Sequence, residues 1–229
     1  MATDTQDPDD DSALPLRERK KQRTRRALAD TALTLFSERG FDRVTLDELT
    51  AHVEIGRSTF FRYYGTKEDV AMAAEGELWD AYTTRFDQHA TPGPALDALR
   101  TSLTAAVLSM PDGWDQRFLR TRRLAAGTPV LHNHSLVSSM KVQQRLVETL
   151  ETRLDADSRE DVRLRLLGEF ALSAWRCGAR NWVAGRAPDG PTGPIGHGGP
   201  PALARRVEEA FDAIPASLTL DLPASEKPK

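Results

Sequence analysis

The chain has 229 residues, a formal net charge of −3 and 39% hydrophobic residues, enough for a small domain joined to one of typical size. No apolar run approaches the roughly 20 residues that span a membrane. The N-terminus is acidic, unlike the basic and then apolar start of a signal peptide. We therefore expect a soluble cytoplasmic protein that makes no membrane contact. The single cysteine, Cys177, excludes an intramolecular disulfide.

Charge is distributed unevenly along the chain. Residues 1–16 carry five acidic and no basic side chains, residues 17–70 nine acidic and twelve basic ones, and residues 71–229 twenty acidic and nineteen basic ones. The net charges of the three segments are therefore −5, +3 and −1. We expect residues 1–16 to form a disordered acidic tail, because so polar a segment cannot bury a core.

Two short helices joined by a tight turn are predicted between residues 45 and 64. Thr45 and Glu48 have the spacing of a capping box, in which each side chain satisfies the other residue's free backbone N–H at a helix start. The apolar residues that follow recur at helical spacing: Leu46, Leu49 and Val53. Glu54 to Gly56 interrupt this pattern, and a second helix begins after them. Neither helix is long enough to be stable alone, so both must pack on a third element.

The second helix has one inward and one outward face. At 100° per residue, Phe60 and Tyr64 share the inner face. The remaining residues point outward or to the flanks: Arg57, Ser58, Thr59, Phe61, Arg62 and Tyr63. Such donors bind phosphates and read base edges in a major groove. An ordinary solvated helix face is the alternative, and the outward aromatic ring of Phe61 counts against it.

A basic segment precedes these helices. RERKKQRTRR (Arg17–Arg26) holds seven basic residues and one acid, which is typical of an arm along a phosphate backbone. Together with ALADTALTLFSERGF, VTLDEL, TFFRYY and KED downstream, it makes residues 17–70 resemble the DNA-binding domain of the TetR family of bacterial regulators. The chain departs from the family at Glu54 and Gly56, where Gly and Ser are common, and at Gly65, where Pro is common.

The resemblance implies a set of contacts with double-stranded DNA and a nucleoid-associated location. Phosphate contacts are implied for Thr45, Thr59, Tyr63 and Lys67. Groove contacts are implied for Arg57, Ser58, Phe61 and Arg62.

Longer helices are predicted in the rest of the chain, which gives an all-α fold. Periodicity and capping signals place them at about residues 67–89, 95–110, 115–126, 129–154, 158–185 and 201–214. We expect a helix-turn-helix DNA-binding domain over residues 17–66, a helical ligand-binding and dimerisation domain over 67–215, and a flexible tail over 216–229. The segment Gly185–Pro201 holds six Gly and five Pro, so it predicts a flexible loop, to which we assign no role.

The last two long helices are candidates for a dimer interface. Ala171, Ala174 and Gly178 form a track of small residues that lets another helix approach closely. The final helix carries one apolar stripe: Leu203, Val207, Ala210, Phe211 and Ile214. In the resembled family the last two long helices of each protomer form a four-helix bundle with the partner. Packing within one protomer is the alternative. A homodimer would space two recognition helices about 34 Å apart and predict a palindromic operator.

The resemblance also implies a small-molecule effector between the middle helices. Candidate lining residues are apolar or aromatic: Leu78, Tyr82, Phe86, Phe118, Leu119, Met140, Phe170 and Trp175. Each of them could equally be core. The C-terminal pattern is similar to the subgroup with acyl-CoA-like ligand domains, which includes the regulator associated with mycofactocin gene clusters. Arginines could then pair with ligand phosphates, or simply form a solvated face: Arg117, Arg120, Arg122 and Arg123.

These patterns predict a ligand-responsive DNA-binding regulator in which an effector tilts the helix from Lys67 to His89. The habit of the resembled family implies that this regulator is a repressor. The alternative is a helical adaptor that binds a protein partner and has no specific affinity for DNA. Enzyme, cofactor and metal chemistry have little support. His132 and His134 would lie about 200° apart on a helix, and no glycine loop after a strand could hold a phosphate.

Overall fold

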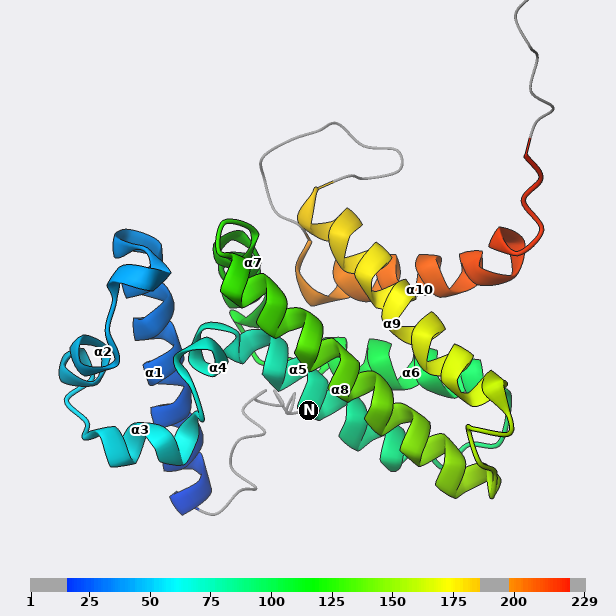
Figure 1. The fold of residues 1–229 in the computed structure, drawn as a ribbon, viewed down its shortest axis with the longest axis horizontal. Coiled ribbons are helices and arrows are strands. Elements are labelled where there is room, and N and C mark those ends of the chain that lie inside the picture. Colours follow the sequence, from blue (N-terminus) through cyan, green and yellow to red (C-terminus); the bar gives the residue numbers. More distant parts are fainter. Residues whose placement is uncertain (1–15, 186–197, 223–229) are drawn as a thin grey trace, which may run out of the picture.

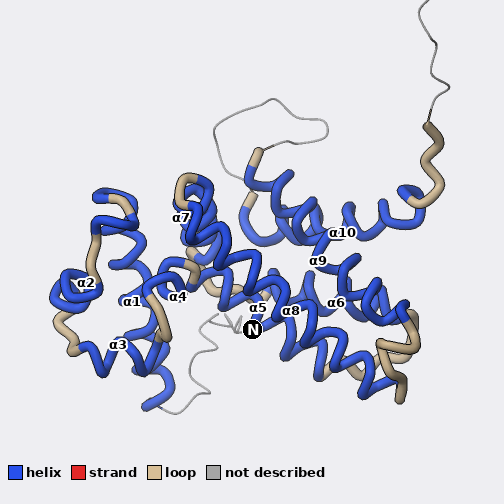
Figure 2. Tube along the Cα trace, in the orientation of Figure 1, coloured by secondary structure: helices blue, strands red, loops and turns tan. Residues whose placement is uncertain are grey.

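The computed structural model describes residues 16–185 and 198–222, and every regular element in those two ranges is helical (Figures 1 and 2). This confirms the predicted all-α class. The predicted acidic tail apart from residue 16, residues 186–197 of the Gly/Pro loop and half of the C-terminal tail lie outside the described residues. The end of the predicted loop is corrected by the structure, because Gly199 to Pro201 form the first turn of a helix that runs to Ser217. Among the described helices, none is long and apolar enough to cross a membrane.

Helices α1 to α4 form a head at one end of the molecule (Figure 1). Its elements are α1 (Leu16–Arg39), a 3₁₀ helix (Phe41–Arg43), α2 (Leu46–His52), α3 (Arg57–Tyr63) and α4 (Lys67–Ala71). The predicted capping box starts α2: Thr45 N donates to Glu48 Oε2 at 2.8 Å, and Glu48 N donates to Thr45 Oγ1 at 3.2 Å. Short helices here are stabilised by a shared core: Leu28, Phe36, Phe41, Leu49, Phe60, Tyr64 and Val70.

Helices α5 to α10 form the body. They are α5 (Ala73–Asp87), α6 (Ala95–Leu108), α7 (Trp114–Ala126), α8 (Pro129–Leu154), α9 (Val162–Val183) and α10 (Gly199–Ser217). Pro129 occupies the first turn of α8, where its missing N–H costs nothing. A second core lies between these helices and includes Leu78, Tyr82, Phe118 and Trp175. The head core extends into the body through Ala125 of α7 and Leu131 of α8.

The helix predicted from Lys67 to His89 is broken at Met72. Glu75 N donates to Met72 O at 3.0 Å. The carbonyl of Ala71 accepts from Thr121 Oγ1 of α7 at 3.3 Å. A contact 50 residues away in sequence therefore stabilises the break, and local periodicity could not indicate it. Helix α9 also begins later than the predicted residue 158: it starts at Val162, and the side chain of Asp161 caps it by accepting from the backbone N–H of Arg163.

The small-residue track on α9 is occupied within the protomer. A Cβ on Gly178 would lie 2.8 Å from the backbone of Arg206 and Val207 on α10. Leu203, Val207 and Phe211 are at most 3% exposed, in the same core. The predicted interface stripe of α10 is therefore used to pack α10 on α9 and α6, so the intramolecular alternative holds for it.

Candidate nucleic-acid interface

Helix α3 presents most of the predicted contact residues to solvent. Phe60 is fully buried and Tyr64 is 4% exposed, as the periodicity predicts. Burial raises the pKa of Tyr64 to about 12, and its hydroxyl donates to the carbonyl of Arg25 on α1. The outward face is exposed at Arg57, Ser58, Phe61 and Arg62, whereas Thr59 and Tyr63 are half-buried. The burial of Phe60 and Tyr64, together with the hydrogen bond from Tyr64 to α1, therefore fixes which side of α3 faces outward.

Phe61 and Arg62 are held in defined positions on that surface. The ring of Phe61 is 54% exposed and meets Phe60 edge-on, with centroids 5.4 Å apart. The guanidinium of Arg62 lies 5.2 Å from the centroid of the Tyr63 ring. Stacking of this kind reduces the side-chain freedom that is lost on binding.

Arg57 is paired within the head. Its Nε and Nη2 each donate to the carboxylate of Asp47 on α2 at 2.5 Å. This bidentate contact joins the two helices of the motif, and it holds the pKa of Asp47 below its ordinary value. Thr45 is exposed but already serves as the cap of α2. Its hydrogen bonds lower the pKa of Glu48.

Lys67 is also engaged inside the head. Its ammonium donates to the carbonyls of Phe41 at 2.9 Å and Val44 at 3.0 Å, and lies 4.1 Å from the centroid of the Phe41 ring. These contacts satisfy carbonyls at the end of the 3₁₀ helix. A phosphate contact by Lys67 stays a prediction, because two of its three donors are used here.

Residues 28–74 match the model for bacterial regulatory proteins of the TetR family. The HTH-type transcriptional regulator TcmR of Streptomyces glaucescens is 27% identical over 172 residues, which cover 73% of this chain and 76% of TcmR. The helix-turn-helix head of the chain is therefore that of the TetR family of regulators.

Two further comparisons agree with membership of the TetR family. MftR of Mycobacterium tuberculosis, whose description names mycofactocin biosynthesis, is 28% identical over 124 residues, or 52% of this chain and 59% of MftR. A TetR-family regulator from Syntrophomonas wolfei aligns over 87% of this chain and 98% of its own, with a TM-score of 0.54 and 14% identity. The similarity to the Syntrophomonas wolfei structure shows a shared fold and nothing further.

Most of the predicted effector-lining residues lie in the core of this TetR-family body. Leu78, Tyr82, Phe86, Phe118 and Trp175 are at most 5% exposed. Leu119 packs against the same core while partly buried. Phe118 and Trp175 meet edge-on with centroids 5.8 Å apart. The Tyr82 hydroxyl is buried without a hydrogen-bond partner, and burial raises the pKa of Tyr82.

Two predicted lining residues lie elsewhere. Met140 is 68% exposed on α8 and does not line the core of its own protomer. Phe170 is half-buried on α9 and is not part of the core cluster. Both positions satisfy the helical periodicity of an apolar side chain. Periodicity cannot distinguish a core-facing stripe from a second apolar face.

The arginines of α7 make contacts within the body and, through Arg120, with the head. Arg117 donates to Glu77 on α5 at 2.8 Å, and Arg120 to Thr34 on α1 at 3.0 Å. Arg122 donates to Glu75 at 3.0 Å. These three guanidinium groups are therefore committed to α1 and α5, and only Arg123 of the predicted set has no contact in the described part of the chain.

Glu75 is a functional candidate that the sequence did not indicate. Its side chain is 3% exposed at the start of α5. One carboxylate oxygen accepts from Ser135 at 2.7 Å and from Trp79 at 3.4 Å, and the other accepts from Arg122. Below it, His134 of α8 lies 3.0 Å from Asp69 of α4. The junction of head and body is thus held by charged contacts from α7 and α8.

Proposed function

We propose that this TetR-family protein is a ligand-responsive repressor that binds a palindromic operator as a homodimer. The observation that carries the proposal is the outward face of α3, where Arg62 and Phe61 lie exposed over a helix anchored by Phe60 and Tyr64. Arginine on an exposed recognition helix is the usual reader of guanine edges in a major groove. Members of the family are usually repressors, which supports the direction of control.

The dimer proposal rests on a face formed by α8 and α9, which lie in front of α5 and α6 in Figure 1. Leu136, Val137 and Met140 on α8 are 46–68% exposed, and Leu166 on α9 is 44% exposed. Exposed large apolar side chains clustered on two packed helices favour a partner surface. A second copy of this chain would cover the same face on both protomers, as two-fold symmetry requires.

The effector proposal rests on the aromatic core of the body. Tyr82 and Ser102 carry buried hydroxyls without partners, which costs free energy unless a group satisfies them. An apolar effector with a hydrogen-bonding group would do so once the helices around Phe118 and Trp175 separate. Because three of the four α7 arginines are committed within the protomer, an acyl-CoA-like phosphate would have Arg123 as its remaining partner.

Selection of bound DNA from a random pool tests the proposal. The full chain should recover an inverted repeat, and Arg62→Ala should relax discrimination at one position of each half-site by roughly 1–3 kcal/mol. Arg85→Ala is the matched control, because Arg85 is an exposed arginine on α5 outside the head.

Repeating the selection with acyl-CoAs and with aromatic compounds tests the effector. A palindrome that one of them abolishes would support both parts of the proposal. Failure to enrich any sequence at low salt would favour the adaptor alternative instead.

A further inference from the structure

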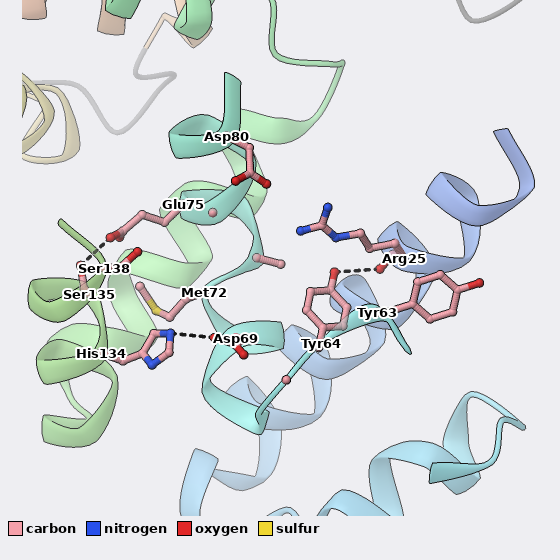
Figure 3. A pocket seen from close by; sticks show the side chains of 13 residues that line it. Arg25, Tyr63, Tyr64, Asp69, Met72, Glu75, Asp80, His134, Ser135 and Ser138 are labelled. Atoms are coloured by element: carbon pink, nitrogen blue, oxygen red, sulfur yellow. Dashed lines mark hydrogen bonds and ion pairs between the residues drawn. The ribbon is translucent and has the colours of Figure 1, made fainter. Parts of the chain in front are cut away.

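A cleft of about 280 Å³ lies between the head and the body (Figure 3). Its walls come from α1, the segment after α3, the α4–α5 junction and α8. It is separate from the aromatic core, because its lining consists mainly of polar residues and includes neither Phe118 nor Trp175. The volume suits a small organic molecule.

Gly76 keeps part of this cleft open. It lies in the interior of α5, where glycine costs about 1 kcal/mol relative to alanine. No neighbouring helix explains the glycine, since a Cβ added there would meet no atom within 4 Å. Gly178, by contrast, is required by the close approach of α10. The space beside Gly76 belongs to the cleft that this residue lines.

Several charged groups of the cleft are already paired. Glu75 is held by Ser135 and Arg122, and Asp69 by His134 and by the capping box of α4. These contacts pair the charged groups that α4, α8 and the start of α5 contribute to the cleft. The two charged residues of the opposite side, Arg25 and Asp80, take no part in these contacts.

Arg25 and Asp80 are the two charged lining residues without an ion pair in the described part of the chain, and the guanidinium of Arg25 lies 5.5 Å from the centroid of the Tyr64 ring. Arg25 extends from α1 toward α5, and Asp80 stands on α5 across the cleft (Figure 3). Their side chains make no ion pair within 4.0 Å in the described part of the chain, and the Arg25 Nε atom is buried without an acceptor. Burial raises the pKa of Asp80, and the charge of Arg25 opposes that shift. A guanidinium and a carboxylate thus face one open space without meeting.

We propose that this cleft binds a small zwitterion of the amino-acid type, with its carboxylate on Arg25 and its ammonium on Asp80. Guanidinium groups bind carboxylates through paired N–H donors, and the exposed carboxylate of Asp80 can accept a charge-assisted hydrogen bond from an ammonium. Met72 and the Tyr64 ring supply apolar contacts for the rest of the molecule. Since Arg25 belongs to the head and Asp80 to the body, an occupied cleft stabilises the head orientation seen here.

Three related probes test the charge assignment on the ¹⁵N-labelled full chain: L-leucine, L-leucinamide and N-acetyl-L-leucine. The first carries both charges, the second only the ammonium and the third only the carboxylate. L-Leucine should shift the amide signals of Ala73 and Gly76 saturably. The two singly charged probes should bind at least about tenfold more weakly, because each lacks one charged hydrogen bond.

Variants test the location. Arg25→Met and Asp80→Asn should each weaken L-leucine binding about tenfold or more. Gly76→Leu should abolish it by filling the cleft, while a thermal melt shows that the variant folds, as the gain in helix propensity favours. The proposal is overturned if L-leucine causes no saturable shifts, if L-leucinamide binds equally well, or if Gly76→Leu binds like the parent chain.

Discussion

Asp47 and Arg57 form a pair whose acidic member faces the proposed DNA surface. The two side chains are exposed, and their bidentate contact ties Arg57 back to α2. Approaching phosphates compete with Asp47 for the guanidinium, and the carboxylate itself repels them. The pair therefore lowers the affinity for DNA, while it fixes the geometry between α2 and α3.

We predict that Asp47→Ala binds non-specific DNA more tightly. The slope of log affinity against log salt should steepen by about 0.9, because one more phosphate contact becomes available. Fluorescence anisotropy over a salt series measures this slope. Asp42→Ala removes the same charge from the exposed 3₁₀ helix, without an arginine partner in the described residues, and should change the slope less. Equal effects of the two variants would contradict a specific role for the pair.

Lys67 is expected to stabilise the head. Replacement by Met keeps the apolar stem but removes the donor to the carbonyls of Phe41 and Val44. Hydrogen bonds to charged groups are worth about 1.5–3 kcal/mol, so Lys67→Met should lower the free energy of unfolding by about that amount.

Urea unfolding followed by circular dichroism measures the Lys67 effect. Lys141→Met, at an exposed lysine of α8 without a contact in the described part of the chain, is the control. Unchanged stability combined with weaker binding to all DNA sequences would instead support the phosphate role predicted from the resemblance.

At the scale of elements, two helical glycines have opposite environments. Gly178 is in contact with the α10 backbone, whereas Gly76 borders open space. Helix propensity alone favours alanine at both positions by about 1 kcal/mol. The difference between the two substitutions therefore isolates the effect of helix packing.

We predict that Gly178→Ala destabilises the body and Gly76→Ala stabilises it. A Cβ placed 2.8 Å from the backbone of Arg206 and Val207 forces α10 to move, and overpacking of this kind costs about 1–3 kcal/mol. Differential scanning calorimetry should show a lower melting temperature for Gly178→Ala and a higher one for Gly76→Ala. A rise for both variants would mean that α10 is not held against α9 in solution.

At the scale of the whole molecule, the connection between head and body is the feature through which an effector must act. Arg117, Arg120 and Arg122 of α7 reach α1 and α5, and a break at Met72 separates α4 of the head from α5 of the body. The tilt predicted for residues 67–89 stays a prediction, and the structure divides this segment into α4 and α5 at Met72. We infer that displacement of α7 by a ligand near Phe118 would reach the head through Arg120 and its hydrogen bond to Thr34 of α1.

Assembly is the other whole-molecule prediction. Leu166→Glu should convert a dimer into a monomer, because it places a charge in the proposed apolar face of α8 and α9. Sedimentation velocity measures the change. Leu108→Glu, at a leucine that is 56% exposed at the end of α6, should leave the dimer intact. Loss of the dimer in both variants, or in neither, would place the interface elsewhere.

The sequence by itself determined the helical class, the capping box at Thr45, and the inward position of Phe60 and Tyr64. These features depend on residues three or four positions apart, whose relation is set by the helix period. It also indicated most of the body core. It could not indicate whether an apolar stripe meets its own chain or a partner, as α10 illustrates.

Tertiary structure alone decided which charged side chains have a hydrogen-bond or ion-pair partner within the chain. Arg122 meets Glu75 across 47 residues, Lys67 meets Phe41 across 26, and Arg57 meets Asp47 across 10. The cleft between Arg25 and Asp80 likewise exists only because α1 and α5 come together. The physical reason is that an ion pair needs proximity in space within a few ångströms. Nothing in local periodicity constrains the distance between segments so far apart in the chain.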